Sequence, residues 1–242
     1  MPLAYEHKRQ QVQTIFDRIA ARYDFLNRVI SFHFDTLWRK KAIQALALSD
    51  PSPLVLDLGS GTGDLALTAA NQLTGARIVG LDFSLPMLQL AMKKKQRVPS
   101  GDRIFFILGS ALAPPLKSDA FDAVMTAFVL RNIGDLKLFF HNAYRLLRPG
   151  GKLVSLDMFP PRRFPFSFFY SFYFYRAVPW IGALLAQDRK AYQYLSHSVK
   201  TFDPPESIAE LIRETGFQEV KMEKFLRGAV CLHLGEKPRT LP

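Results

Sequence analysis

The chain has 242 residues, 48% of them hydrophobic, so it can bury a full core without help from a metal or a disulfide. Its single cysteine, Cys231, excludes an internal disulfide, and the N-terminus lacks the charged start and apolar run of a signal peptide, so we expect a cytoplasmic protein. The 32 Lys and Arg residues against 21 acidic ones give a net charge of +11, which favours anionic partners. Because these basic residues are scattered in ones to threes, solvated helix faces explain them better than a dedicated nucleic-acid surface.

The first fifty residues are predicted to be helical. Apolar residues recur at helical spacing from Val12 to Ile19, and a new apolar stripe begins at Leu37. We expect residues 1–50 to form an N-terminal helical cap on the domain that follows.

From Leu54 to Met158 short apolar runs alternate with amphipathic segments. We predict, in order, strand 54–58, helix 65–73, strand 77–81, helix 84–96, strand 104–108, strand 120–127, helix 136–147 and strand 152–158. Strands that alternate with helices in this way are typical of an α/β fold with a doubly wound, mostly parallel sheet.

The C-terminal pattern ends differently. A helix over 205–215 precedes two β-rich runs at 217–225 and 229–234, and only Leu226-Arg227-Gly228 separates those runs. So short a connection can only join antiparallel strands. Five parallel strands followed by an antiparallel hairpin form the seven-stranded sheet of class I S-adenosylmethionine-dependent methyltransferases. We therefore expect residues 51–242 to form one Rossmann-like methyltransferase domain.

Aromatic residues are concentrated in one segment, because Phe or Tyr occupies ten of the seventeen positions from Phe159 to Tyr175. A transmembrane helix needs about 20 uninterrupted apolar residues, but Pro165, Arg176 and Pro179 interrupt the longer apolar stretch Phe164–Ala186. We interpret residues 159–203 as an insertion that recognises the methyl acceptor, with the aromatic stretch as a folded cap or an interfacial helix. The alternative is that these rings are ordinary core of a second layer.

A glycine-rich loop joins the first predicted strand to its helix. Glycines let the backbone approach a ligand closely at the carboxyl edge of the sheet, and the G-x-G-x-G spacing is tighter than the G-x-G-x-x-G of dinucleotide folds. Asp57 and Asp64 flank the loop, and carboxylates there repel a phosphate but attract an ammonium group. The loop therefore favours S-adenosylmethionine over a nicotinamide cofactor, and the cofactor-binding candidates in it are Asp57, Gly59, Gly61, Thr62 and Gly63.

Asp82 closes the second strand, where a carboxylate accepts hydrogen bonds from both hydroxyls of a ribose. The alternative for Asp82 is an acid at the N-terminus of a helix. Next to it, Phe83 and Met87 are candidates for packing on adenine or for the core.

Several blocks of the sequence resemble those of the ubiquinone/menaquinone biosynthesis C-methyltransferases, from about Val12 to Pro238. The resemblance is carried by Tyr23-Asp24-Phe25-Leu26-Asn27, the Gly59–Asp64 loop, Ala127-Phe128-Val129-Leu130-Arg131-Asn132, Tyr144–Gly151, Tyr192-Gln193-Tyr194-Leu195 and Leu232–Pro238. The loop alone would indicate only a methyltransferase. The Leu-Arg-Asn and Tyr-x-Tyr-Leu blocks are more specific, and they resemble those of the methyltransferases that act on quinones.

Carried over to this chain, the resemblance implies that Thr62, Asp82 and the pair Ser110-Ala111 contact the cofactor. It also implies that Arg131 and Asn132 face the acceptor, a prenylated quinol such as demethylmenaquinol. The chain departs from the family pattern at two places. Ser110 stands where the family usually has Asp or Asn, and the segment 33–36, His-Phe-Asp-Thr, replaces the usual Gly-x-His-Arg.

Methyl transfer to a ring carbon needs an electron-rich ring, so the acceptor is expected as a quinol. Arg131 is the candidate for stabilising its phenolate form, and the alternative is a structural ion pair with Asp135 or with an acid of the first helices. Two residues are candidates for accepting the ring proton. One is His197, whose alternative is an exposed loop residue without a role. The other is Asp157, which we expect to face the cleft. Candidates for hydrogen bonds to the quinol oxygens are Tyr23, Tyr192 and Tyr194. The sequence indicates no metal site, because no cluster of His and Cys residues has the spacing of metal ligands.

Other readings stay open at this point. They are methylation of a benzoquinol in the ubiquinone pathway, of another lipid or of RNA, and a non-catalytic role at a membrane surface. The aromatic stretch favours a lipid acceptor over RNA, so we expect peripheral contact with the inner face of a membrane and no nucleic-acid partner. A homodimer is left open.

Overall fold

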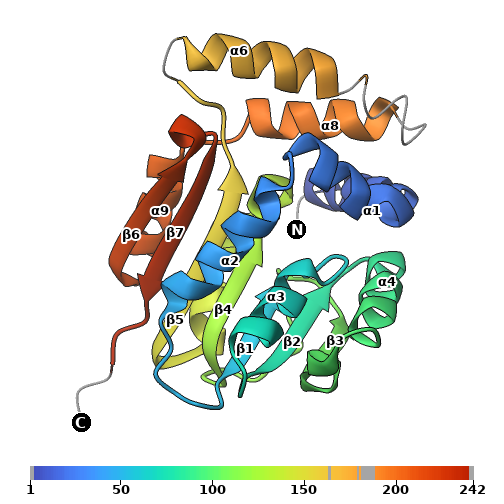
Figure 1. Cartoon of the computed structure of the whole chain (residues 1–242). Coiled ribbons are helices and arrows are strands. Elements are labelled where there is room, and N and C mark those ends of the chain that lie inside the picture. Colours follow the sequence, from blue (N-terminus) through green and yellow to red (C-terminus); the bar gives the residue numbers. More distant parts are fainter. Residues whose placement is uncertain (1–2, 163–164, 179, 181–188, 240–242) are drawn as a thin grey trace.

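The computed structural model describes residues 3–162, 165–178, 180 and 189–239. Its centre is one seven-stranded sheet in the order β3-β2-β1-β4-β5-β7-β6 (Figure 1). β1, β2, β3, β4 and β5 are parallel to one another, and β7 lies antiparallel between β5 and β6. The strands are β1 Leu54–Leu58, β2 Arg77–Asp82, β3 Ile104–Leu108, β4 Phe121–Ala127, β5 Leu147–Met158, β6 Gln218–Phe225 and β7 Val230–Glu236. The predicted fold class, a doubly wound sheet with a terminal antiparallel hairpin, is confirmed.

Helices cover both faces of the sheet, which is why its central strands read as continuous apolar runs. On one face α2 (Phe34–Leu46) and α3 (Asp64–Gln72) share a core cluster with Val55 and Met125. On the other face Phe139 and Phe140 of α5 (Leu136–Leu146) share a core cluster with Ile208 and Ile212 of α9 (Pro205–Glu214). The remaining sheet helix is α4 (Leu85–Lys95). Short 3-10 turns, η1 (Pro99–Arg103), η2 (Leu130–Asn132) and η4 (Leu226–Gly228), complete the connections.

A third layer lies across the carboxyl ends of the parallel strands (Figure 1). It consists of α1 (Leu3–Ile30), α6 (Phe166–Phe172), the π-helical turn η3 (Tyr173–Ala177) and α8 (Arg189–Lys200). Leu26, Phe174 and Val199 belong to the core cluster that joins these helices. The aromatic segment, expected to be a folded cap or an interfacial helix, is helical from Phe166 to Ala177. The domain boundary at residue 50 stays a prediction. Of the two helices before it, α1 lies in the third layer and α2 packs on the sheet.

One strand is longer than its pattern indicates. The predicted strand 152–158 begins earlier in the structure, because β5 already starts at Leu147. Leu147 pairs with Phe121 and Lys152 pairs with Ala123, so the intervening residues form an irregularity within the strand. Gly150 takes a φ of 78° there, which a residue with a side chain adopts only under strain.

Among the residues that the structure describes, no helix is long and apolar enough to cross a membrane. Instead the aromatic segment divides by environment. Phe174 is buried and Phe159 packs on Phe202, whereas Phe168 and Phe172 are 63% and 67% exposed. The reading of all these rings as ordinary core is therefore wrong for Phe168 and Phe172. Phe164 lies outside the described residues.

Replacing both Phe168 and Phe172 with Ser should change the free energy of unfolding by less than about 1 kcal/mol, because exposed side chains contribute little to folding. Phe174→Ala is the matched comparison, and it should cost about 3–5 kcal/mol because it empties a buried ring site. Denaturant titration followed by circular dichroism measures both. Unfolding of the double Ser variant would restore the core interpretation.

Candidate active site

The glycine-rich loop leaves β1 at Leu58 and enters α3 at Asp64. Its three glycines differ in the space around them. A Cβ on Gly59 would lie 2.6 Å from a methyl carbon of Val129, and one on Gly63 would lie 2.9 Å from the ring of Phe106. A Cβ on Gly61 would meet no atom within 4 Å. Packing thus requires Gly59 and Gly63, while Gly61, at a φ of 53°, leaves open space beside the backbone.

That open space is a cavity, here called the loop cavity, at the carboxyl ends of β1, β2 and β4. Phe83 and Met87 from the start of α4 line it together with Phe16 and Tyr23 of α1. Of the predicted cofactor and acceptor residues, Asp57, Gly59, Gly61, Thr62, Asp82, Ala111 and Asn132 line it. Gly63 and Ser110 do not line it, and the Ser110 hydroxyl accepts a hydrogen bond from the Leu112 amide at 3.2 Å. The cofactor roles of these residues stay predictions.

Asp57 is the polar group of this cavity whose surroundings are incomplete. It is 1% exposed, and neither carboxylate oxygen has a hydrogen-bond partner among the described residues. Burial raises the pKa of Asp57 to about 8, with a smaller contribution from the nearby Asp82, and outweighs the opposing effect of the nearby Ala66 amide, which makes no hydrogen bond of normal geometry to the carboxylate. A buried carboxylate without partners is rare in proteins, so Asp57 fits a ligand that brings its own cationic donor.

Asp82 is held differently, although burial raises its pKa too. Its oxygens accept hydrogen bonds from the Gly61 amide at 2.7 Å and from the Ser84 amide at 2.9 Å. These bonds fix the carboxylate at the end of β2 and leave lone pairs toward the cavity that it lines. The arrangement suits acceptance of two hydroxyl hydrogen bonds.

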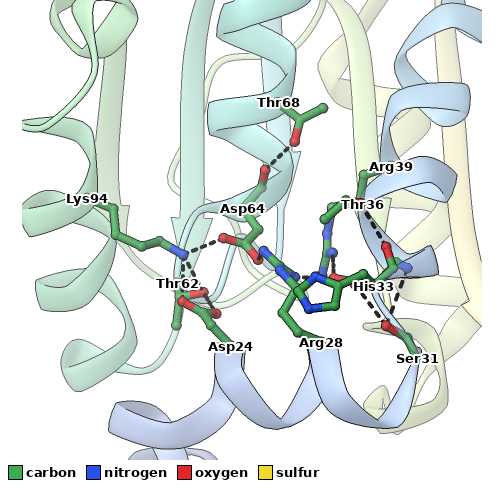
Figure 2. A network of polar contacts seen from close by, with 11 residues as sticks. Asp24, Arg28, Ser31, His33, Thr36, Arg39, Thr62, Asp64, Thr68 and Lys94 are labelled. Carbon is green, nitrogen blue, oxygen red and sulfur yellow. Dashed lines mark hydrogen bonds and ion pairs between the residues drawn. The ribbon is translucent and has the colours of Figure 1, made fainter.

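Beside the loop, an ion-pair network fastens α1 and α2 to the loop cavity (Figure 2). The Thr62 hydroxyl donates to Asp24 at 2.5 Å, and the Lys94 ammonium contacts both Asp24, at 2.8 Å, and Asp64. Arg28 contacts Asp64 at 2.7 Å and also pairs with Asp35. The network consists of Asp24, Arg28, Asp35, Arg39, Thr62, Asp64 and Lys94.

Two expectations change because of this network. Asp64 is not left for a ligand ammonium: burial alone would raise its pKa, but Arg39, Lys94 and Arg28 outweigh burial and hold the pKa at about 2. The segment 33–36, where the chain departs from the family pattern, supplies Asp35, which is 2% exposed and also pairs with Arg39. Only the Asp35–Arg39 pair follows a helical spacing rule, and no such rule connects Asp24 with Lys94 or Arg28 with Asp64.

Arg131 and Asp157 form a buried ion pair at 2.5 Å. Burial alone would lower the pKa of Arg131, but the charge and hydrogen bond of Asp157, together with Tyr23 and Tyr194, outweigh burial and raise the pKa, so the guanidinium stays protonated. Asp157 also accepts the Met158 amide at 2.7 Å and lines none of the described cavities. The expectation that Asp157 faces the cleft is therefore wrong.

The other acceptor-side candidates are dispersed. Asp135, offered as a partner for Arg131, instead caps α5 by accepting the Leu138 amide at 2.9 Å. The Tyr194 hydroxyl donates to the Asn132 side chain at 3.2 Å. His197 is exposed, but on α8 and not in a loop. The side chain of Tyr192 lies outside the described part.

A second, larger hollow, the aromatic cavity, has a volume of about 340 Å³, which is in the range of small-molecule sites. Its lining is mostly apolar and comes from α1, α2, the η2 region, the end of β5, α6 with η3, α8, and η4 with the start of β7. Phe166, Phe169 and Phe174 of the aromatic stretch line it, together with Trp38 and Arg131. Sequence reasoning predicted aromatic residues around an acceptor but did not identify the contribution of α2 and η4.

Phe128 lies between the two cavities and lines both. Its φ of 63° is in the left-handed region, which costs free energy for a residue with a side chain. The guanidinium carbons of Arg39 and Arg131 lie 5.1 and 5.8 Å from its ring centroid, within cation–π range. A third small cavity, lined by Tyr23, Arg131 and Asn132 among others, shares residues with both larger ones, so the two sites are adjacent.

Solved structures with the same architecture show the fold. A possible histamine N-methyltransferase of Thermotoga maritima aligns with a TM-score of 0.64 at 22% identity, covering 93% of this chain and 98% of that one. The [4+2]-cyclase SpnF aligns at 0.71 with 16% identity, covering 95% and 97%. These likenesses show the fold, which is that of class I S-adenosylmethionine-dependent methyltransferases.

Sequence comparison narrows the class. The ubiE/COQ5 methyltransferase family model matches residues 4–237, and the chain belongs to that family. The demethylmenaquinone methyltransferase of Thermus thermophilus is 41% identical over 93% of this chain and 100% of its own length. The ubiquinone/menaquinone biosynthesis C-methyltransferase UbiE of Geobacter sulfurreducens is 38% identical over 95% and 90%. The resemblance stated from the sequence is confirmed, and the chain is a methyltransferase.

The raised pKa of Asp57 predicts a pH dependence of ligand binding. Below about pH 8 the carboxyl of the ligand-free protein is mostly protonated, and an ammonium ligand must first displace that proton. The affinity for S-adenosylhomocysteine should therefore rise between pH 6.5 and pH 8, with proton release that calorimetry detects in buffers of different ionisation enthalpy. Asp57→Asn should bind more weakly and lose the pH dependence; an unchanged dependence in this variant would assign it to another group.

Proposed function

We propose that this methyltransferase transfers a methyl group from S-adenosylmethionine to a ring carbon of a prenylated naphthoquinol, the reduced form of demethylmenaquinone. The observation that carries the proposal is the adjacency of the two cavities. One presents an unpartnered carboxylate beside an open glycine backbone, and the other is large and aromatic with a buried arginine. The names of the relatives, demethylmenaquinone methyltransferase in several bacteria, support a naphthoquinol.

The residues of the loop cavity fit the cofactor. Asp57 would accept the methionine ammonium, and Asp82, already fixed by two amides, would accept the ribose hydroxyls. Phe83, Met87 and Ala111 would pack on adenine. When bound, the cofactor supplies a methyl group on a sulfonium centre. The chain contributes a preformed site, because the network around Asp64 already holds α1 over the cavity.

Arg131 is the proposed catalytic residue on the acceptor side. Its guanidinium lines the aromatic cavity, is charged, and is oriented by Asp157. In so apolar a surrounding a fixed cation favours the phenolate form of a quinol, whose ring carbon is the better nucleophile. Asn132 lines the loop cavity next to it and is held by Tyr194 and by the Phe128 carbonyl, to which its amide donates at 3.3 Å.

The test is methylation of reduced, short-tail demethylmenaquinol by the purified enzyme, with product mass as the readout and a benzoquinol as competitor. Arg131→Ala should lower kcat by about 100-fold with little change in affinity for S-adenosylhomocysteine, because the cation acts on charge that develops at the acceptor. Arg131→Lys should recover only part of the rate.

Arg131→Ala also leaves Asp157 buried without a partner, which is destabilising. The control is therefore Arg131→Met combined with Asp157→Asn, which removes both charges, and it should be folded and equally slow. Near-normal turnover in this control would make the Arg131–Asp157 pair structural. Absence of methylated naphthoquinol from the wild type would refute the proposed function.

The exposed rings of the cap support contact with a membrane, where a prenylated quinol resides. Phe168, Phe169 and Phe172 are exposed on α6, Trp180 is exposed shortly after it, and Phe32 packs against Tyr173 of η3. Aromatic side chains insert at the headgroup level of a bilayer. Arg162 and Arg176 are exposed near the same helix and suit anionic headgroups, while Arg163 lies outside the described residues. We place this face on the inner, cytoplasmic side of the membrane.

The double variant Phe168→Ser/Phe172→Ser should bind vesicles of phosphatidylglycerol and phosphatidylcholine at least tenfold more weakly than the wild type, because it removes the apolar anchor. Phe105→Ser is the matched control, since Phe105 is 50% exposed on the distant edge strand β3. Cosedimentation at low and high salt separates the aromatic from the electrostatic contribution. Equal loss in both variants, or no loss in either, would exclude this face.

A further inference from the structure

Two residues that line the aromatic cavity each carry a buried polar atom without a partner. The Tyr170 hydroxyl and the Arg131 Nε make no hydrogen bond among the described residues, and both residues belong to the cavity lining. Buried side-chain donors are nearly always satisfied by protein or by ordered water, so such exceptions indicate a site that something else completes. Both groups are donors, and a quinol presents two ring oxygens.

The Tyr170 ring is fixed by its neighbours. It stacks on Phe174, with ring centroids 5.1 Å apart and planes 8° apart, and meets Tyr175 edge-on at 6.4 Å. Phe174 is itself buried, and its carbonyl accepts a hydrogen bond from Ser196 of α8 at 2.8 Å. The position of the Tyr170 hydroxyl is therefore set by packing and needs no hydrogen bond of its own.

Neighbouring tyrosines show that the fold can satisfy such hydroxyls. Tyr173, which also lines the cavity, donates to the Ile30 carbonyl at 3.0 Å, and Tyr194 donates to Asn132. Burial raises the pKa of Tyr170, so its phenol remains protonated and can only be a donor toward an anionic or carbonyl oxygen. The charge of Arg131 acts to lower the pKa of Tyr170, an effect smaller than that of burial, so the two groups are close enough to interact electrostatically.

We propose that Tyr170 recognises the acceptor: its hydroxyl donates a hydrogen bond to one ring oxygen of the quinol, and Arg131 serves the other. This inference rests on the proposed function and deepens it. Tyr170 then distinguishes oxygenated rings from hydrocarbons of the same shape, because a site built to donate a hydrogen bond disfavours a ligand that cannot accept one. Sequence reasoning had offered Tyr23, Tyr192 and Tyr194 for this role and had not singled out Tyr170 among the ten aromatic residues.

The experiment compares Tyr170→Phe with Tyr175→Phe, a matched control from the same segment whose ring contacts Tyr170 but does not line the cavity. Binding of reduced short-tail menaquinol, which is already methylated, is followed by tryptophan fluorescence with S-adenosylhomocysteine present. A Trp180→Phe background leaves Trp38, which lines the cavity, as the reporter. Turnover of demethylmenaquinol and thermal unfolding without acceptor are measured in parallel.

Tyr170→Phe should raise the Kd for the quinol and lower kcat/KM about tenfold, with unchanged affinity for S-adenosylhomocysteine. Its unfolding temperature without acceptor should stay the same or rise, because the variant removes an unsatisfied buried group. Tyr175→Phe should match the wild type in turnover and in quinol binding.

Unchanged quinol binding and turnover in Tyr170→Phe, in an enzyme whose wild type methylates the quinol, would overturn this inference alone. A lower unfolding temperature with unchanged quinol binding would make the hydroxyl structural. If the wild type neither binds nor methylates the quinol, the proposed function fails instead.

Discussion

A parallel sheet brings the carboxyl ends of its strands to one edge, and in this chain three strands carry an almost fully buried acid at or next to that end. Asp82 is the last residue of β2, and Asp57 and Asp157 are the last residues but one of β1 and β5. Buried carboxylates are costly unless each charge is neutralised or hydrogen-bonded. Asp157 is paired with Arg131, Asp82 accepts two backbone amides, and Asp57 has neither. Of these three carboxylates, only that of Asp57 lacks a partner among the described residues, so a ligand is expected beside Asp57.

The loop cavity must also be closed against water, because it is the proposed cofactor site and lies at the edge of the sheet. Here α1 provides the closure, held by Asp24 and Arg28 to residues of α3 and α4 (Figure 2). The carboxylates and cations of this network are partly buried, so their interactions are less screened than those of surface pairs. Substitutions there should affect access to the cavity more than the chemistry within it.

The aromatic segment has two faces because its helix lies between a cavity and solvent. Phe166, Tyr170 and Phe174 are spaced four residues apart and line the inner side, whereas Phe168 and Phe172, also four apart, are exposed. Phe169 does both, since it lines the cavity and is 66% exposed, and so marks the rim. In the proposed function, this helix connects an apolar site for the quinol ring with an apolar surface for a lipid.

The sequence by itself determined the order of elements, the G-x-G-x-G loop and the terminal hairpin, because these follow from local periodicity and from glycines that the backbone requires. It also determined the family, through blocks such as the Leu-Arg-Asn at Leu130. Only the tertiary structure decided the partners: Arg131 with Asp157, which are 26 residues apart, Lys94 with Asp24, which are 70 apart, and the missing partner of Tyr170. Pairing across such separations depends on how elements pack in space, and no spacing in the chain encodes a contact between helices joined only by the fold.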